Sequence, residues 1–259
     1  MIKKVYSNIL CDDTVRKLSA IGIEKLSDYV NELEASPEAV NLHFKDKIEM
    51  LIDRLYQNKI NDTIKRLKAG AKLSEPNASI QSIVYDEGRK LNRSSVLELS
   101  NCDFMNRATN VVIEGTTGCG KTYLACAIAN AAIEKCFKTK YVRMPDLLQE
   151  FEEREAMHKP KSLLVKKYSR PTLLVIDEWL LQTTTESFCN FLLEIFERRK
   201  DSSTIFCTLY EQSEWHSRLG GNVQAESVID RIIHNCIDVV IGDLNMRAYT
   251  SPIKNNKKQ

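Results

Sequence analysis

Long apolar runs are missing from this sequence, and no stretch approaches the length of a membrane-spanning helix. The first residues, MIKKVYSNILCDDTV, also lack the apolar core and the small-residue cleavage site of a secretory signal. The eight cysteines and four histidines are scattered, with no C-x-x-C pair and no Cys/His cluster, which disfavours disulfides, zinc sites and His-based nucleophilic catalysis. We therefore expect a cytoplasmic protein with reduced cysteines and no membrane partner.

A strong excess of charge is missing as well. The chain has 37 basic and 35 acidic residues, so any basic surface that binds nucleic acid must be local. With 259 residues, of which 43% are hydrophobic, the chain can form one sizeable α/β core and a smaller module.

Residues 1–73 are predicted to form a small helical domain, because apolar side chains recur there at helical spacing. Ser36-Pro37 interrupts the pattern and indicates at least two helices. Basic residues gather near the end of this domain, at Lys59, Lys65, Arg66, Lys68 and Lys72. They fit a solvated helix face as well as a DNA-facing one, so the domain is expected to contact a partner or DNA.

Residues 74–259 are predicted to form an α/β domain, beginning in the linker-like Leu73–Asn77. Short apolar segments alternate there with helical patterns, which is typical of a parallel, doubly wound sheet flanked by helices. Five strands are expected, at 110–114, 139–143, 172–176, 204–208 and 237–241.

The stretch GTTGCGKT follows the first of these strands and precedes a helical pattern, which is the setting that a phosphate-binding P-loop requires. Its glycines let consecutive backbone N–H groups approach phosphate oxygens. Lys121 would neutralise the β and γ phosphates, and Thr122 would offer a hydroxyl to Mg²⁺. The predicted nucleotide site comprises Gly115, Thr116, Thr117, Gly118, Cys119, Gly120, Lys121, Thr122 and Tyr123.

A second motif, LLVIDEW, is an apolar strand that ends in two acids. Alone it could be the start of a loop, but beside a P-loop it is the expected Walker B strand. Asp177 would hold Mg²⁺ through water, and Glu178 would orient and polarise the attacking water. The two motifs together favour ATP hydrolysis over ATP binding alone.

Five segments of the chain resemble the IstB proteins, the ATP-binding partners of insertion-sequence transposases: GTTGCGKTYLACAIANAA, YVRMPDLL, LLVIDEW, TIFCTLYEQSEWHSRLGG and SVIDRIIHNCIDVVIGDLNMR. The helical N-terminal part and the connector from Ala71 to Phe104 also look IstB-like, so the resemblance covers nearly the whole chain. IstB proteins are relatives of DnaC and DnaA in the AAA+ class. The resemblance implies an AAA+ P-loop ATPase preceded by a helical domain.

In AAA+ proteins the nucleotide lies between subunits, and the resemblance carries two arginines over to this chain. Arg231, in VIDRII, matches the finger that reaches a neighbour's γ-phosphate, and Arg247, in NMR, matches the sensor-2 arginine of the same subunit. The family commonly has Asn or Gln as sensor 1, where this chain has Leu209 preceded by Thr208. Thr208 is expected to substitute or to contribute weakly, and this departure fits a slow, assembly-coupled ATPase.

The family also carries extra helices before the Walker B strand, on the face that meets nucleic acid. The matching region, Asp146 to Tyr168, contains Arg154, Lys159, Lys161, Lys166 and Lys167. These cations suit phosphate contacts, which tolerate any sequence and weaken with salt. No aromatic residues are interleaved with them for base stacking, so duplex DNA is expected rather than single strands.

The leading hypothesis is an ATP-dependent AAA+ helper of transposition. It would oligomerise on duplex DNA through ATP-bearing interfaces and recruit and stimulate an IstA-like transposase of the DDE type. The nearest alternative is a DnaC-like helicase loader on single-stranded DNA. A small-molecule kinase would need an acceptor pocket and an arginine-bearing lid, which are not recognisable, and a scaffold that barely hydrolyses ATP remains open.

Overall fold

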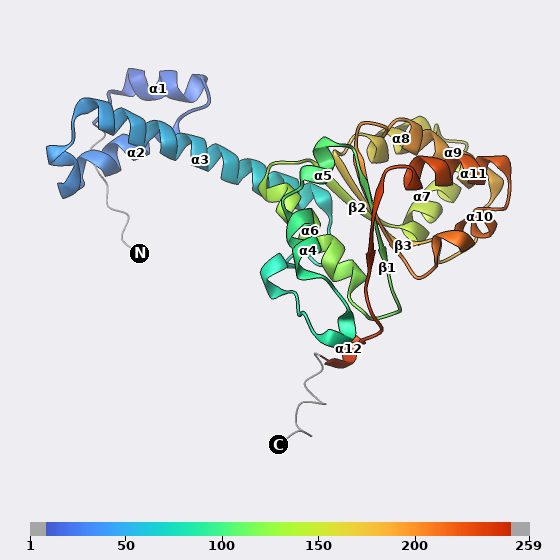
Figure 1. Ribbon diagram of the computed structural model, residues 1–259. Helices are drawn as coiled ribbons and strands as arrows, with labels where there is room; N and C mark the ends of the chain where they lie inside the picture. The colour runs from blue at the N-terminus through green and yellow to red at the C-terminus, as the bar shows by residue number, and fades with distance from the viewer. Residues whose placement is uncertain (1–8, 250–259) are drawn as a thin grey trace. The chain divides into compact units, whose positions relative to one another are not determined.

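Residues 9–249 are described by the computed structural model, and the chain divides into two compact units, residues 1–65 and 66–259 (Figure 1). The first unit is helical. It contains α1 (Asp12–Ala20), α2 (Lys25–Glu34), the short 3-10 helix η1 (Pro37–Asn41) and the first part of α3 (Phe44–Ala71). Within the described residues, no helix is both long enough and apolar enough to cross a lipid bilayer.

The interruption between α2 and α3 lies at Ser36-Pro37, because Ser36 is extended and Pro37 opens η1. The domain boundary that we expect after Leu73 stays a prediction. α3 ends at Ala71 and is followed by Lys72 in the left-handed region, with φ 55°. The compact units divide earlier, between Lys65 and Arg66 inside α3.

The second unit is built on a parallel sheet of five strands in the order β2-β3-β4-β1-β5. The strands are β1 (Asn110–Glu114), β2 (Thr139–Arg143), β3 (Leu173–Trp179), β4 (Ser203–Thr208) and β5 (Cys236–Val240). Each expected strand is present, with the starts of β3 and β4 and both ends of β5 shifted by one residue. β3 continues to Trp179 because the chain pairs again with Thr208 after an irregularity that follows Ile176.

Alternate side chains of the strands enter two separate cores, one on each face of the sheet. Val111 and Ile113 pack with α6 (Lys121–Glu134), whereas Val112 lies in the other core. That second core is formed with α7 (Met144–Ala156), α8 (Ser162–Ser169), α9 (Glu186–Glu197), α10 (Trp215–Arg218) and α11 (Val223–Ile233). Figure 1 shows α6 and the α7–α11 group on opposite faces.

Short elements surround α6 and close the same face of the sheet. They are η2 (Ile80–Ser82), η3 (Glu87–Arg89), α4 (Arg93–Ser100) and α5 (Asp103–Asn106). Two other short elements are η4 (Gln212–Glu214), which precedes α10, and α12 (Met246–Tyr249), which follows β5. α4 and η2 both contact α6. Because all strands are parallel, the carboxyl ends of β1, β3 and β4 meet at one edge, where ligands bind in open α/β sheets.

Candidate nucleotide-binding site

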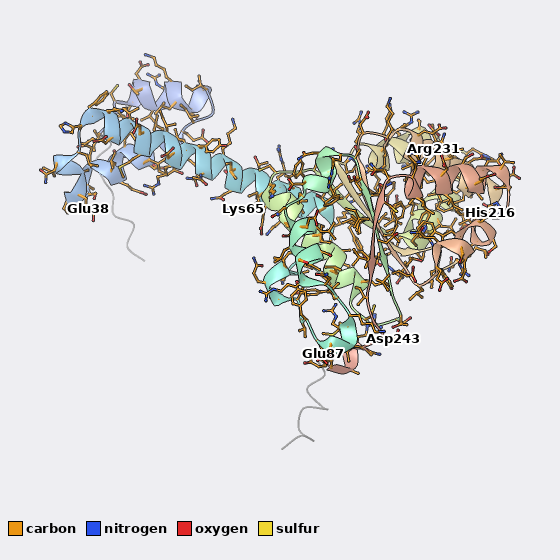
Figure 2. All side chains as sticks on the ribbon, in the orientation of Figure 1. Glu38, Lys65, Glu87, His216, Arg231 and Asp243 are labelled. Carbon is orange, nitrogen blue, oxygen red and sulfur yellow. The ribbon has the colours of Figure 1, made fainter. Side chains whose placement is uncertain are left out.

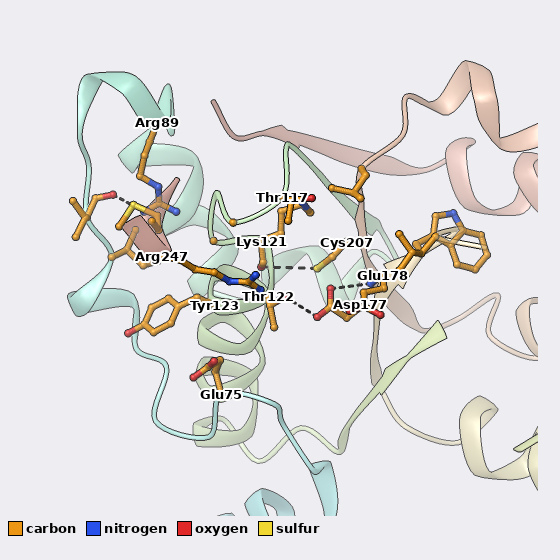
Figure 3. A pocket seen from close by; sticks show the side chains of 18 of the residues that line it. Glu75, Arg89, Thr117, Lys121, Thr122, Tyr123, Asp177, Glu178, Cys207 and Arg247 are labelled. Carbon is orange, nitrogen blue, oxygen red and sulfur yellow. Dashed lines mark hydrogen bonds between the residues drawn. The ribbon is translucent and has the colours of Figure 1, made fainter. Parts of the chain in front are cut away.

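A cavity of about 690 Å³ lies at the carboxyl ends of β1, β3 and β4 (Figure 3). It is lined by residues that lie far apart in the sequence: the segment Ser82–Val84, the P-loop, the end of β3, Cys207 within β4, Leu209 after β4, and Met246 and Arg247 of α12. The volume falls within the range of small-molecule and cofactor sites.

The P-loop bends sharply into α6 at two glycines. Gly118 has φ 85° and Gly120 has φ 97°, a region that other residues rarely adopt. A Cβ on Gly118 would lie 2.8 Å from the Asn245 side chain, and one on Gly120 would lie 2.9 Å from Arg89. The turn therefore places the first N–H groups of α6 at the cavity, where the helix dipole favours an anion.

The predicted nucleotide residues divide into those that line the cavity and those that support the loop. Thr117, Gly118, Gly120, Lys121, Thr122 and Tyr123 line the cavity. Cys119 is fully buried, and the carbonyls of Gly115 and Thr116 accept hydrogen bonds from Lys121 Nζ, at 2.6 and 2.8 Å. A bound phosphate would replace these carbonyls as the acceptor, because the attraction between the ammonium and an anion is stronger than a hydrogen bond to a neutral carbonyl.

Asp177 is buried, with 5% exposure, and its carboxylate is held by three donors. Thr122 Oγ1 and Tyr141 OH both donate to Oδ2, at 2.7 and 2.8 Å, and the Glu178 N–H donates to Oδ1 at 2.9 Å. Burial, followed by the charge of Asp177, raises the pKa of Tyr141, so this hydroxyl keeps its proton and acts as a donor.

The Thr122 hydroxyl and the Asp177 carboxylate are hydrogen-bonded beside the predicted phosphate site, and oxygen atoms of this kind suit Mg²⁺. In residues 9–249 no group of three His, Cys, Asp or Glu side chains could hold a metal by itself. Mg²⁺ binds through one or two protein oxygens, substrate phosphates and water. Thr122 and Asp177 are the residues that would hold it.

Glu178 lines the cavity but its carboxylate is engaged elsewhere. Arg143, at the end of β2, donates to Glu178 Oε2 from Nε at 3.1 Å and from Nη2 at 2.8 Å. Glu178 itself has φ 55°, so the chain turns abruptly at the residue that is predicted to polarise water. Both hydrogen bonds are accepted by Oε2, so the Arg143 guanidinium competes with water for the carboxylate that is predicted to polarise it.

Arg89 is a cavity residue that the sequence reading missed. It is buried, with 3% exposure, and its Nη1 donates to the Val84 carbonyl and its Nη2 to the Cys119 carbonyl, while Nε has no partner among the described residues. Burial lowers its pKa. No acid balances this guanidinium within the ion pairs of residues 9–249, so an anionic ligand in the cavity would complement it.

The two predicted arginines take different places. Arg247 of α12 lines the cavity of its own chain (Figure 3). Arg231 lies near the end of α11, and its backbone carbonyl accepts a hydrogen bond from the Asn110 side chain, at the start of β1, at 3.4 Å. The P-loop begins after the end of β1, roughly 16 Å along the strand. Figure 2 shows Arg231 and Asp243, which follows β5, at opposite edges of the sheet.

Thr208 is not brought to the cavity, in contrast to its expected role. Its Oγ1 accepts a hydrogen bond from the Tyr210 N–H at 3.0 Å, and the residue is buried with 1% exposure. Its neighbours Cys207 and Leu209 line the cavity instead, because successive side chains of a strand point to opposite faces. The structure therefore disfavours Thr208 as a sensor of the nucleotide.

The five cations predicted to bind DNA lie in and between α7 and α8 but differ in their availability. Lys161 pairs with Glu155 at 2.7 Å, Lys167 pairs with Glu150 at 2.6 Å, and Arg154 donates to the Pro160 carbonyl. Lys159 and Lys166 are exposed, and neither has an acidic partner within the described part of the chain. These two lysines are the ones most available to phosphates.

Comparison with known proteins gives one family match and several structural likenesses. The sequence model of the family described as IstB-like ATP binding protein matches residues 16–252. An insertion-sequence ATP-binding protein of Sinorhizobium fredii is 28% identical over 240 residues, covering 92% of this chain and 96% of the relative.

Solved structures share the fold. AMPPCP-bound DnaA from Aquifex aeolicus has a TM-score of 0.55 at 21% identity, covering 72% of this chain and 56% of that one. The DnaC helicase loader has a TM-score of 0.54 at 21% identity, covering 64% of this chain and 97% of that one. The second unit therefore has the AAA+ fold of the DnaA and DnaC proteins.

Proposed function

Because this chain belongs to the IstB-like ATP-binding protein family, we propose that it is an ATPase that assembles on duplex DNA and stimulates a partner transposase. The insertion-sequence context of its relatives supports a role in transposition. The partner would be an IstA-like transposase of the DDE type. ATP would bind at subunit interfaces of a homo-oligomer and hold the assembly together.

The observation that carries this proposal is the separation of Arg231 from its own cavity. Arg231 donates to Glu197 at 3.0 Å and to the Ser227 carbonyl at 2.9 Å, at the edge of the sheet opposite the P-loop. A guanidinium that far from the cavity would not contact a γ-phosphate bound by its own chain, and in the proposed oligomer it would contact the nucleotide of an adjacent copy. Arg247 then serves the nucleotide from within the same subunit, so a complete site needs two chains.

The remaining residues have separate roles in the proposed hydrolysis. Lys121 and the N–H groups of α6 bind the phosphates, and Thr122 and Asp177 hold Mg²⁺, which would neutralise the developing charge. Glu178 polarises the attacking water once its carboxylate has left Arg143. Hydrolysis would then be slow until assembly supplies Arg231 and releases Glu178.

The first unit offers a surface suited to a protein partner. Four apolar residues spaced four apart along α3 are exposed: Phe44, Ile48, Ile52 and Tyr56, with exposures of 79%, 39%, 58% and 61%. A row of large apolar side chains in water marks an interaction site. We propose that this face of α3 binds the transposase.

Mass photometry with a duplex oligonucleotide tests the assembly directly. Large complexes are expected with ATP and Mg²⁺, and small species with ADP or without nucleotide, because the γ-phosphate is what Arg231 would contact. The same measurement with a single strand of equal length separates the two DNA hypotheses. Preferential assembly on the single strand would favour a helicase loader, and a monomer that ignores both DNA and ATP would contradict the proposal.

Lys159 and Lys166 are expected to contribute more to duplex binding than Lys161 and Lys167, because the second pair already has carboxylate partners. The Lys159→Ala/Lys166→Ala variant should lower the slope of log affinity against log salt by about one per lysine. The Lys161→Ala/Lys167→Ala variant is the matched control with the same loss of charge. Equal slopes for the two variants and the wild type, measured by fluorescence anisotropy, would exclude this surface.

A further inference from the structure

Tyr141 occupies an unusual position for a tyrosine beside a nucleotide site. It lies on β2, which pairs with β3 so that Tyr141 is opposite Val175 and Arg143 is opposite Asp177. Its ring belongs to the core on the α6 face, with 8% exposure. From there its hydroxyl reaches Asp177 Oδ2 at 2.8 Å, on the same oxygen that accepts the Thr122 hydroxyl.

These contacts determine which part of the Asp177 carboxylate is free. An ionised carboxylate has about four acceptor positions, two on each oxygen. Tyr141 and Thr122 occupy Oδ2, and the Glu178 N–H takes one position on Oδ1. The acceptor position that remains is on Oδ1, so Asp177 can receive a hydrogen bond from one metal-bound water while both oxygens stay fixed.

We propose that Tyr141 is a positioning residue for magnesium: its hydroxyl fixes Asp177 so that the carboxylate binds a water of the metal. This inference rests on the proposed Mg²⁺–ATP site and extends it to a residue outside the P-loop and the Walker B strand. Thr122 would then be the protein residue that binds the metal, and Asp177 would act on it through water. Without the Tyr141 hydroxyl, the buried carboxylate loses one of its three donors and its fixed orientation.

The experiment measures the binding of a fluorescent ATP analogue to wild type and to Tyr141→Phe while the Mg²⁺ concentration is raised. Mg²⁺ is expected to increase the nucleotide affinity, and Tyr141→Phe should need about tenfold more Mg²⁺ to reach half of that increase. This is the effect of losing a hydrogen bond to a charged group. Its affinity in EDTA should equal that of wild type, because Tyr141 contacts Asp177 rather than the P-loop. A purely structural role would weaken binding equally with and without Mg²⁺.

Tyr168→Phe is the matched control. Tyr168 is also buried, with 1% exposure, and its hydroxyl also donates to a carboxylate, Glu150, at 3.2 Å. Unlike Asp177, Glu150 does not line the cavity. This variant should lose a similar amount of thermal stability and keep the wild-type magnesium requirement. An unchanged requirement in Tyr141→Phe, or an equal change in both variants, would overturn the role of Tyr141.

The titration is read on nucleotide binding alone, so it remains interpretable if the protein fails to assemble on DNA. That failure would contradict the proposed function and leave the role of Tyr141 standing. A wild-type affinity that does not respond to Mg²⁺ would overturn the magnesium site and the role of Tyr141 together.

Discussion

Glu178→Gln is expected to slow ATP hydrolysis by about 100-fold or more, the usual loss when a general base is removed, while ATP binding is retained. Glu178 lines the cavity beside Asp177 but makes no hydrogen bond to the P-loop in the described structure. The side-chain amide of glutamine has nearly the same shape as the glutamate carboxylate, but it cannot take a proton from water. The variant should therefore trap an ATP-bound oligomer on duplex DNA, seen as complexes that persist in mass photometry while phosphate release stops.

The Glu178→Gln variant loses both the Glu178 carboxylate and its ion pair with Arg143. Arg143→Gln is the control, because it removes the ion pair and keeps the carboxylate. The substitution removes the two hydrogen bonds to Glu178 and leaves that carboxylate free. It also removes the contact of Arg143 with Asp146, at 3.6 Å. Hydrolysis should persist in this variant, and a faster basal rate would agree with Glu178 being held back. If Glu178→Gln hydrolyses ATP at the wild-type rate, or fails to hold DNA with ATP, the proposed switch is wrong.

Arg231→Ala is expected to reduce the rate of hydrolysis by about 10³-fold or more, the range for an arginine finger, with little change in ATP affinity. Lys121→Ala should fail to bind ATP. Mixing the two inactive variants should restore part of the activity, because a Lys121→Ala subunit can supply its intact Arg231 to the intact P-loop of an Arg231→Ala neighbour. Phosphate release across a mixing series measures this recovery.

Arg247 provides the control for that experiment, because it lines the same cavity as Lys121. A mixture of Lys121→Ala and Arg247→Ala should stay inactive, since every pocket then lacks one of two residues of its own chain. Glu197→Gln tests whether the surface ion pair of Arg231 matters by itself, and such exposed pairs contribute only about 0–1 kcal/mol. Absence of recovery in the first mixture would contradict a site shared between subunits.

Much of this architecture could be predicted because it follows from local patterns. The strands have apolar, β-branched segments between turn residues, and the glycines of GTTGCGKT permit backbone conformations that few other sequences tolerate. The family resemblance then implied the AAA+ fold, and the structural likeness confirmed it. The roles of the two arginines and the DNA contacts stay predictions, to be tested by the experiments above.

The residues that the sequence reading missed act through contacts between distant segments. Tyr141 and Arg143 alternate on a strand that was correctly placed, so both could have been assigned to one face beside the Walker B strand. Their partners Asp177 and Glu178 depend on the register of β2 against β3, and no local pattern determines that register. Arg89 gave no signal at all, because its acceptors are backbone carbonyls that any sequence has.

The sequence by itself determined the phosphate-binding loop, the acidic end of β3 and the parallel sheet, since each depends on residue types at short spacing. Only the tertiary structure decided which side chains complete the site. It placed Tyr141 on the Asp177 carboxylate, turned Thr208 away from the cavity and left Arg231 at the far edge of the sheet. The physical reason is that side-chain contacts depend on strand order, register and pleat, which arise when the whole sheet packs on its helices.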